Sequence, residues 1–241
     1  MLATKERQFN SLIKNYQKSG PVKLGIHTSH FWRTNPKRLL FFLSRYKFVA
    51  RMLAGCDDVL EIGCGDGFGA EIVLQEVKRV HCVDFDPLFI EHASKENHSK
   101  RVTFAVADLT KKPVFPRKDA VYAVDVLEHI KKSAEGRFLR NIVRSLKGNG
   151  ICIMGTPTLE SQKYASIWSK EGHVNCKSGE DLRKSMMRYF ERVFLFSMND
   201  EVVHTGFYPM AHYLFALCTN PRRVSQVIHD RSNDARQQEQ H

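Results

Sequence analysis

The chain has 241 residues, of which 42% are hydrophobic and 26% are charged. This composition excludes a largely disordered protein and leaves room for one domain with a hydrophobic core, with or without an added cap. The longest apolar runs, such as residues 39–43, are far shorter than the ~20 residues of a membrane span. The first ten residues are charged and contain no apolar stretch, so no secretory signal is expected.

The six cysteines are scattered, without the paired spacing of a metal or redox motif. A chain of this length does not need disulfides to fold, so a reducing, cytoplasmic environment is expected, and no membrane partner. The oligomeric state is left open.

The positive charge is concentrated near the N-terminus. Residues 1–55 hold 11 Lys and Arg side chains and a single acid, Glu6, so they carry +10 of the total net charge of +11. Such asymmetry indicates an anionic partner, which is a phosphorylated or acidic small molecule, a nucleic acid or a membrane surface. A solvated helical face explains the charge equally well.

In chain order, the pattern first predicts helices and then an alternation of strands and helices. Pro36 opens a helix whose apolar residues recur at helical spacing, and Gly55 ends it. Candidate strands follow at Val59–Ile62, Arg79–Val83, Val102–Val106, Ala120–Val124 and Ile151–Met154. Helical patterns lie between them near 68–77, 87–95 and 134–147. Strands that are apolar throughout indicate a parallel sheet covered on both faces, which is the doubly wound α/β class.

Beyond Gly155 the alternation weakens. A helix is predicted from Ser178 to about Tyr189, followed by strands at Val193–Phe196 and Met210–Cys218. Their connection is too short for a crossover helix, so the two strands are expected to be antiparallel. The predicted organisation is a basic helical cap at 1–55, the main domain at 56–218 and a polar tail at 219–241.

The sharpest local motif is the glycine-rich segment that follows the first predicted strand. Glycine occupies every second position from Gly63 to Gly69, which allows positive φ angles and close approach of a ligand to the main chain. The end of such a strand is where an open α/β sheet binds nucleotides. Asp84 ends the second strand, 21 residues after Gly63, and an acid there can accept hydrogen bonds from both ribose hydroxyls.

The motif alone does not identify the nucleotide. It satisfies a loose dinucleotide fingerprint, so an NAD-type oxidoreductase is an open alternative. Glu61 argues against it, because a carboxylate just before the loop repels a diphosphate and attracts an ammonium group. A third acid, Asp108, ends the next strand.

Together with residues 125–130 and 146–150, these motifs resemble the class I S-adenosylmethionine-dependent methyltransferases over about residues 55–160. The resemblance implies a Rossmann-like seven-stranded sheet with an antiparallel last strand, and S-adenosylmethionine as cofactor. It implies that Asp84 binds the ribose and Asp108 the adenine amino group, while the methionine part is held by Glu61, Gly63, Gly65 and Gly67. The implied cofactor site also includes Cys64, Phe85, Leu109 and Asp125.

Two histidines are the catalytic candidates. The Asp125-x-x-Glu128-His129 arrangement is similar to that of ubiquinone-pathway O-methyltransferases, where such groups can hold a divalent cation. A packing role beside the cofactor is the alternative for His129, and no metal site is predicted. His173 is the preferred general base, because a His-x-Asn flanked by glycine in a polar loop is not a packing pattern, although a plain surface histidine is as compatible with the sequence.

The predicted function is a methyltransferase that acts on a small molecule, by O-methylation of an anionic or sugar-containing acceptor. An RNA methyltransferase whose basic N-terminal region grips phosphates is the main alternative. Against this alternative, the sequence lacks the Asn/Asp-Pro-Pro-Tyr and Pro-Cys motifs that nucleic-acid methyltransferases use to modify bases. A catalytically silent cofactor-binding partner is a third reading. Residues 27–33 either clamp the acceptor or anchor the cap.

Overall fold

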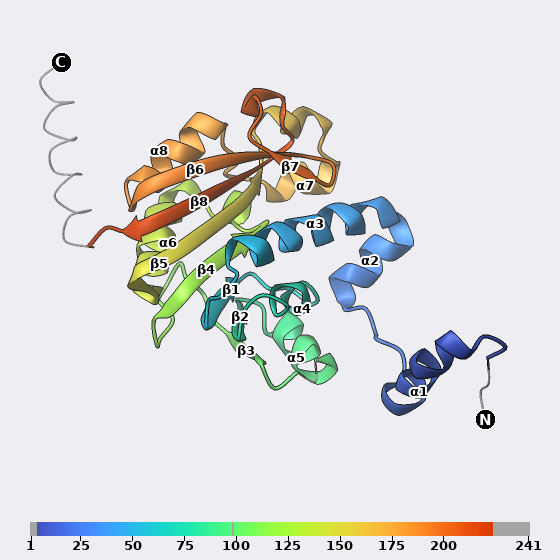
Figure 1. Ribbon diagram of the computed structural model, residues 1–241. Helices are drawn as coiled ribbons and strands as arrows, with labels where there is room; N and C mark the ends of the chain where they lie inside the picture. Colours follow the sequence, from blue (N-terminus) through green and yellow to red (C-terminus); the bar gives the residue numbers. More distant parts are fainter. Residues whose placement is uncertain (1–3, 98, 224–241) are drawn as a thin grey trace, which may run out of the picture.

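The computed structural model describes residues 4–97 and 99–223. Its centre is an eight-stranded mixed β-sheet with the strand order β3-β2-β1-β4-β5-β8-β6-β7 (Figure 1). The strands are β1 (Asp58–Ile62), β2 (Arg79–Asp84), β3 (Val102–Val106), β4 (Lys118–Val124), β5 (Leu146–Pro157), β6 (Phe190–Asn199), β7 (Val202–His204) and β8 (Tyr213–Pro221). Each of the seven predicted strands is present, and the short edge strand β7 was not predicted.

The strand directions confirm the doubly wound α/β prediction. β1 pairs in parallel with both β2 and β4, β2 pairs in parallel with β3, and β4 pairs in parallel with β5. β8 is antiparallel to both β5 and β6, as expected for the last predicted pair. The chain leaves β1 towards β2 and later returns to β4 on the other side. The carboxyl end of β1 is therefore the switch point where open α/β sheets bind ligands.

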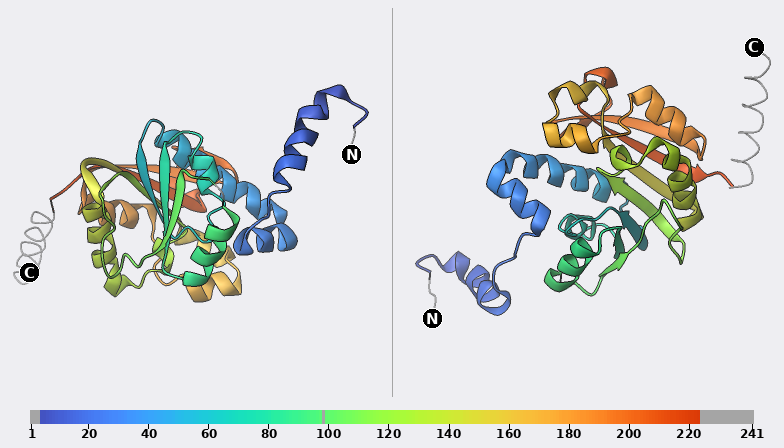
Figure 2. Two further views of the ribbon diagram at one scale, coloured as in Figure 1. Left: turned by 90° about the horizontal axis from the view of Figure 1, so that it is seen from below. Right: turned by 180° about the vertical axis from the view of Figure 1, so that it is seen from behind.

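Helices cover both faces of the sheet (Figure 2). One face packs against α3 (Pro36–Met52), α4 (Ala70–Val73) and α5 (Pro87–Glu96), and the other against α6 (Lys132–Ser145) and α8 (Gly179–Met187). The core face of α6 follows from its sequence, because Phe138, Leu139 and Ile142 recur at helical spacing and are at most 1% exposed. Burying each such side chain contributes about 1.5–3 kcal/mol.

The N-terminal segment extends away from the sheet. The residues of η1 (Arg7–Phe9) and α1 (Asn10–Ser19) are not buried, and these elements project outward in Figures 1 and 2. The chain then reaches α2 (Ile26–Thr34), which leads directly into α3. Within the described residues, no helix is both long and apolar enough to cross a membrane. The division into a cap at 1–55 and a main domain stays a prediction.

Several boundaries differ from those expected. The helix predicted at 68–77 is only four residues long, because the chain continues in tight turns before it enters β2. β8 runs to Pro221, so 219–221 belong to the sheet and not to the predicted tail, whereas 224–241 lie outside the described residues. The remaining elements are η2 (Leu127–His129), η3 (Glu160–Tyr164), α7 (Ile167–Gly172) and η4 (Tyr208–Met210).

Candidate active site

The glycine-rich loop leaves β1 at the switch point of the sheet. Gly63, Gly65 and Gly67 have φ angles of +72°, +52° and +70°, which L side chains rarely adopt. The backbone N–H groups of Gly63 and Cys64 donate to the carbonyl oxygen of Val83 at 2.8 and 3.2 Å, which ties the start of the loop to β2. A Cβ on Gly65 would meet no atom within 4 Å, so the main chain is open to a ligand there.

Two of the predicted acids lie at neighbouring strand ends. Asp84 is 7% exposed, and its oxygens accept hydrogen bonds from the N–H groups of Gly65 and Asp86, both at 3.0 Å. The N–H of Ala107 donates to the carbonyl oxygen of Asp84 at 2.9 Å, which brings Asp108 to the same edge of the sheet. The structure thus places both acids at neighbouring strand ends, with Asp84 in direct contact with the loop.

The surroundings of Asp108 keep it charged. Burial alone would raise the pKa of Asp108, but hydrogen bonds from Thr110 and the nearby Lys111 ammonium outweigh it, so the pKa is lowered. Phe85, directly after the ribose candidate, is 75% exposed, whereas the Leu109 side chain is buried. An exposed aromatic ring can stack on a planar ligand, and an ionised carboxylate can accept a hydrogen bond from an amino group, so these residues are compatible with an adenine ring.

Glu61 lies beneath the loop. Its carboxylate is 1% exposed and accepts a hydrogen bond from the Tyr46 hydroxyl at 2.7 Å, while the Cys82 thiol lies 3.3 Å from the other oxygen. Burial raises the pKa of Glu61 to about 7. These contacts join α3 to β1 and β2. A contact between the Glu61 carboxylate and the cofactor stays a prediction.

The loop also anchors α2, through a residue that the sequence prediction missed. The Asp66 carboxylate accepts hydrogen bonds from the N–H and the hydroxyl of Thr28, at 2.8 and 2.9 Å. A carboxylate at a helix N-terminus satisfies a free N–H and interacts favourably with the helix dipole. The Phe31 side chain is buried on the same helix, whereas Trp32 is 56% exposed. Thr28 and Phe31 therefore anchor α2, and a clamp on the acceptor formed by residues 27–33 stays a prediction.

Arg45 is a second residue that the sequence prediction missed. Its guanidinium group forms an ion pair with Asp125 after β4 and stacks on the Tyr213 ring, 3.9 Å from the ring centroid. Burial alone would lower the pKa of Arg45, but the neighbouring Asp125 outweighs it and raises the pKa. Asp125 itself has a φ of +57°, a strained conformation that aims its side chain at this cluster.

Glu128, His129 and His173 form a cluster at the carboxyl ends of β4 and β5. Each offers one potential ligand atom, and these atoms all lie within 4.8 Å of one another. The two imidazole rings meet edge to face, with centroids 5.2 Å apart. The structure therefore brings together the two predicted catalytic histidines, which are separated by 44 positions in the chain.

Hydrogen bonding determines which histidine nitrogens are available. Gln162 donates from Nε2 to the carbonyl oxygen of Thr158, so its Oε1 must accept from His173 Nδ1, at 2.8 Å. His129 Nδ1 likewise lies 3.0 Å from the carbonyl oxygen of Gly172, which can only accept. Each neutral ring therefore carries its proton on Nδ1 and has a lone pair on Nε2, for which no hydrogen-bond donor is found among the described residues.

The charges around this cluster favour neutral groups. Burial and the neighbouring His129 lower the pKa of His173, although Asp125 acts in the opposite direction. Burial and Asp125 raise the pKa of Glu128 well above its usual value. At neutral pH, His173 is therefore an uncharged base that can accept a proton.

The same three residues are of the types that bind a divalent cation. Two imidazoles that each donate Nδ1–H to an oxygen, with one carboxylate beside them, are typical of metal ligands. The set differs from the one that the motif suggested, because Asp125 is paired with Arg45 and His173 takes its place.

Comparison with known proteins agrees with this geometry. Residues 60–154 match the family model Methyltransf_11, described as a methyltransferase domain. The chain contains a class I S-adenosylmethionine-dependent methyltransferase domain. This finding confirms the family, the enzyme class and the cofactor that the sequence predicted.

Relatives of this methyltransferase domain are similar over part of their length. A probable S-adenosylmethionine-dependent methyltransferase of Mycobacterium tuberculosis is 32% identical over 121 residues, which are 48% of this chain and 43% of that protein. A ubiquinone biosynthesis O-methyltransferase of Rickettsia akari is 26% identical over 136 residues, 55% of this chain and 53% of that protein. The methyltransferase chain thus spans about half the length of these relatives.

Solved structures share the methyltransferase fold. The N-methyltransferase NodS from Bradyrhizobium japonicum, in complex with S-adenosyl-L-homocysteine, has a TM-score of 0.59 and 19% sequence identity. The match covers 90% of this chain and all of that chain (100%).

Proposed function

We propose that this protein transfers the methyl group of S-adenosylmethionine to a hydroxyl oxygen of a small, anionic or sugar-containing acceptor. The state of His173 supports this proposal, because its Nε2 lone pair is free and its ring is neutral. A hydroxyl group is a poor nucleophile until its proton is removed, whereas a carbon nucleophile or a neutral amine needs little help from a base.

In the proposed site, the cofactor lies across the carboxyl ends of β1, β2 and β3. Asp84 accepts hydrogen bonds from the ribose hydroxyls, and Asp108 accepts one from the adenine amino group. The other proposed cofactor-binding residues are Glu61, Gly63, Cys64, Gly65, Gly67, Phe85, Leu109 and Asp125. S-adenosylmethionine supplies both the methyl group and the leaving sulfur, so the main task of the protein is alignment.

In the proposed step, the acceptor oxygen forms a bond to the methyl carbon as the carbon–sulfur bond breaks. The hydroxyl proton passes to His173 Nε2, and the products are a methyl ether and S-adenosylhomocysteine. His129 contributes by its position, because a second ring nearby disfavours protonation of His173 before the acceptor binds.

The charge of the N-terminal region supports an anionic acceptor. Part of it is neutralised within the fold, as in the ion pairs of Arg45 with Asp125 and of Arg51 with Glu76. Exposed basic side chains that have no ion pair among the described residues are Arg33, Lys37 and Lys47. Such exposed charges raise the local concentration of an anionic substrate.

The direct test is turnover with phenols, sugars and sugar nucleotides, followed as release of S-adenosylhomocysteine. His173→Ala is expected to lower turnover about 10²–10⁴-fold, the usual contribution of a general base, without changing the Kd of the cofactor. The control is His81→Ala, because His81 lies on β2 and contacts Thr103 rather than the site. Equal turnover of His173→Ala and the unaltered protein would remove this residue as the base.

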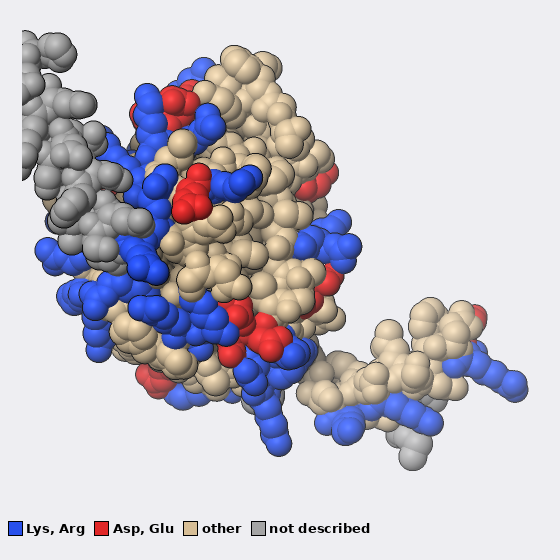
Figure 3. Space-filling model, turned by 60° about the vertical axis from the view of Figure 1, so that its left-hand side comes forward, with Lys and Arg blue, Asp and Glu red and all other residues tan. Residues whose placement is uncertain are grey.

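Methylation of RNA is the competing reading, and one surface favours it. A hollow of about 450 Å³ at the amino ends of β4 and β5 is lined by basic residues that include Arg117, Arg144, Lys147 and Arg222. Lys and Arg side chains gather on one side of the face shown in Figure 3. This hollow lies at the end of the sheet opposite the strand-end acids, so a bound nucleic acid would have to reach around the molecule to be methylated. Steep loss of oligonucleotide binding with added salt, together with turnover on RNA, would favour this reading over a small acceptor.

A further inference from the structure

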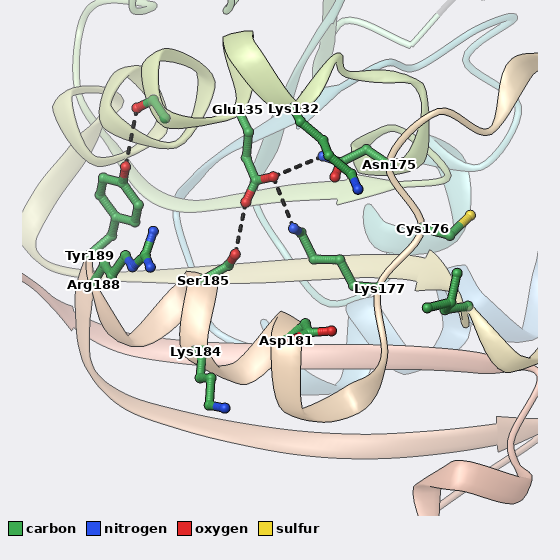
Figure 4. A pocket seen from close by; sticks show the side chains of 12 residues that line it. Lys132, Glu135, Asn175, Cys176, Lys177, Asp181, Lys184, Ser185, Arg188 and Tyr189 are labelled. Carbon is green, nitrogen blue, oxygen red and sulfur yellow. Dashed lines mark hydrogen bonds and ion pairs between the residues drawn. The ribbon is translucent and has the colours of Figure 1, made fainter. Parts of the chain in front are cut away.

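A pocket of about 440 Å³ lies between α6 and α8, outside the site described above (Figure 4). Lys132 and Glu135 line it from α6, and Lys184 lines it from α8, which Arg188 directly follows. Residues 175–177 form a third wall. The strand-end acids and the two catalytic histidines are not among the described residues that line it. Its volume is within the ~300–1,000 Å³ range of small-molecule sites.

The floor of the pocket is a buried polar network. The Glu135 carboxylate accepts hydrogen bonds from Asn175 Nδ2 at 2.9 Å and Ser185 Oγ at 2.8 Å, and Lys177 Nζ lies at 2.9 Å (Figure 4). Burial alone would raise the pKa of Glu135, but these three partners outweigh it and lower the pKa. The network is therefore an ion pair with its charges balanced, held in a fixed geometry.

Asn175 leaves one polar atom without a partner. Its side chain is 1% exposed, and Nδ2 must face Glu135 because a carboxylate can only accept. Oδ1 is therefore directed away from Glu135, and it is buried without a hydrogen-bond partner among the described residues. An unpaired buried acceptor destabilises the fold, so a ligand that donates to Oδ1 recovers the lost free energy.

The rim of the pocket is positively charged. The lining residues include four cations and two acids, Glu135 and Asp181. Lys132 and Arg188 have no ion pair with any residue that the structure describes, and both side chains are exposed at the pocket mouth. The rim thus attracts an anion, whereas the floor offers one acceptor for a hydrogen-bond donor.

We propose that this pocket binds a phosphate group that carries a donor, either free phosphate or a phosphorylated small molecule. The phosphate oxygens contact Lys132 at the rim, and an O–H of the ligand donates to Asn175 Oδ1. Arg188, on the other side of Glu135, adds to the positive charge that attracts the anion (Figure 4). The pocket is distinct from the methyl-transfer site and does not depend on that activity.

The pocket is connected to the active site through the backbone. The N–H groups of Val174 and Asn175 both donate to the carbonyl oxygen of Glu128, at 2.8 and 3.0 Å, and His173 precedes them. A ligand that holds Asn175 from the pocket side therefore restricts the segment that carries the proposed base. Bound phosphate thereby stabilises the position of His173 through the neighbouring residues 174 and 175, from the side of the pocket.

Calorimetric titration of the full chain with phosphate and with sulfate tests the proposal. At neutral pH phosphate keeps a P–OH donor and sulfate has none. Phosphate is therefore expected to bind about tenfold more tightly, a difference of ~1.4 kcal/mol that lies within the cost of leaving a buried acceptor unpaired. Ribose 5-phosphate, titrated alongside, distinguishes a phosphorylated molecule from the free anion by its higher affinity. Equal affinities for phosphate and sulfate, or no saturable binding of any probe at millimolar concentration, would overturn the proposal.

A charge-reversed pair locates the binding site. Lys132→Glu combined with Arg188→Glu is expected to abolish phosphate binding. The control combines Arg137→Glu and Arg183→Glu, exposed residues of α6 and α8 that do not line the pocket. If both double variants lose phosphate affinity equally, the net charge of the protein alone attracts phosphate, which would contradict a specific site. In hydrogen exchange, phosphate is expected to slow the amides of residues 174 and 175 several-fold in the unaltered protein, and an unchanged rate would contradict the coupling to the catalytic segment.

Discussion

Substitution of Glu61 by Gln tests the reasoning about the acid beneath the glycine loop. Burial raises the pKa of Glu61 from an ordinary value of 4.5 to about 7, although the Tyr46 and Cys82 hydrogen bonds act in the opposite direction. The carboxyl group is therefore expected to bind its proton more tightly in the folded protein than in the unfolded chain.

The direction of the effect on stability follows from this difference. Between pH 4.5 and 7 the folded protein holds more protons at Glu61, so the free energy of unfolding falls as the pH rises. The contribution of Glu61 is complete below pH 4.5 and is lost as the pH rises through about 7. The interval between the two pKa values corresponds to about 3 kcal/mol.

Glu61→Gln removes this titration and keeps an oxygen that accepts from the Tyr46 hydroxyl. Relative to the unaltered protein, the variant is expected to gain about 3 kcal/mol of unfolding free energy between pH 4 and pH 8, measured by urea denaturation at both pH values. Glu180→Gln, on the exposed side of α8, is the control and should show no such gain. If the difference between Glu61→Gln and the unaltered protein is the same at both pH values, the reasoning about a protonated Glu61 is refuted.

Three further predictions concern the cofactor, the N-terminal anchor and metal dependence. Asp84→Asn should weaken the calorimetric Kd of S-adenosylhomocysteine about 10- to 150-fold, because a hydrogen bond to a charged group contributes ~1.5–3 kcal/mol, while Asp119→Asn at the other end of the sheet leaves it unchanged. An unaltered Kd in Asp84→Asn would contradict the ribose assignment. Asp66→Ala removes the acceptor at the start of α2 and should lower the free energy of urea unfolding by about 0.5–2 kcal/mol, and equal stability would show that this contact does not anchor the helix. Methyl transfer should persist in EDTA because neutral His173 needs no metal to accept a proton, whereas activity lost in EDTA and restored by one divalent cation would assign the cluster to metal binding.

The sequence by itself determined the sheet and the nucleotide loop. Buried parallel strands are apolar throughout, so their positions can be predicted from the apolar runs in the sequence. Positive φ angles favour glycine, so the turn after β1 can be predicted at Gly63, Gly65 and Gly67. Asp84 and Asp108 follow from the same local logic, because a residue just after a parallel strand must lie at one edge of the sheet.

Only the tertiary structure decided how distant side chains pair. The ion pair of Arg45 with Asp125, the contact of Tyr46 with Glu61 and the meeting of His129 with His173 join different helices, strands and loops. Local propensity reports whether a helix forms and which face is apolar, but not the angle and register at which it packs on the sheet. A polar residue within an apolar helix face, such as Arg45, therefore has no readable partner until the packing brings one within reach.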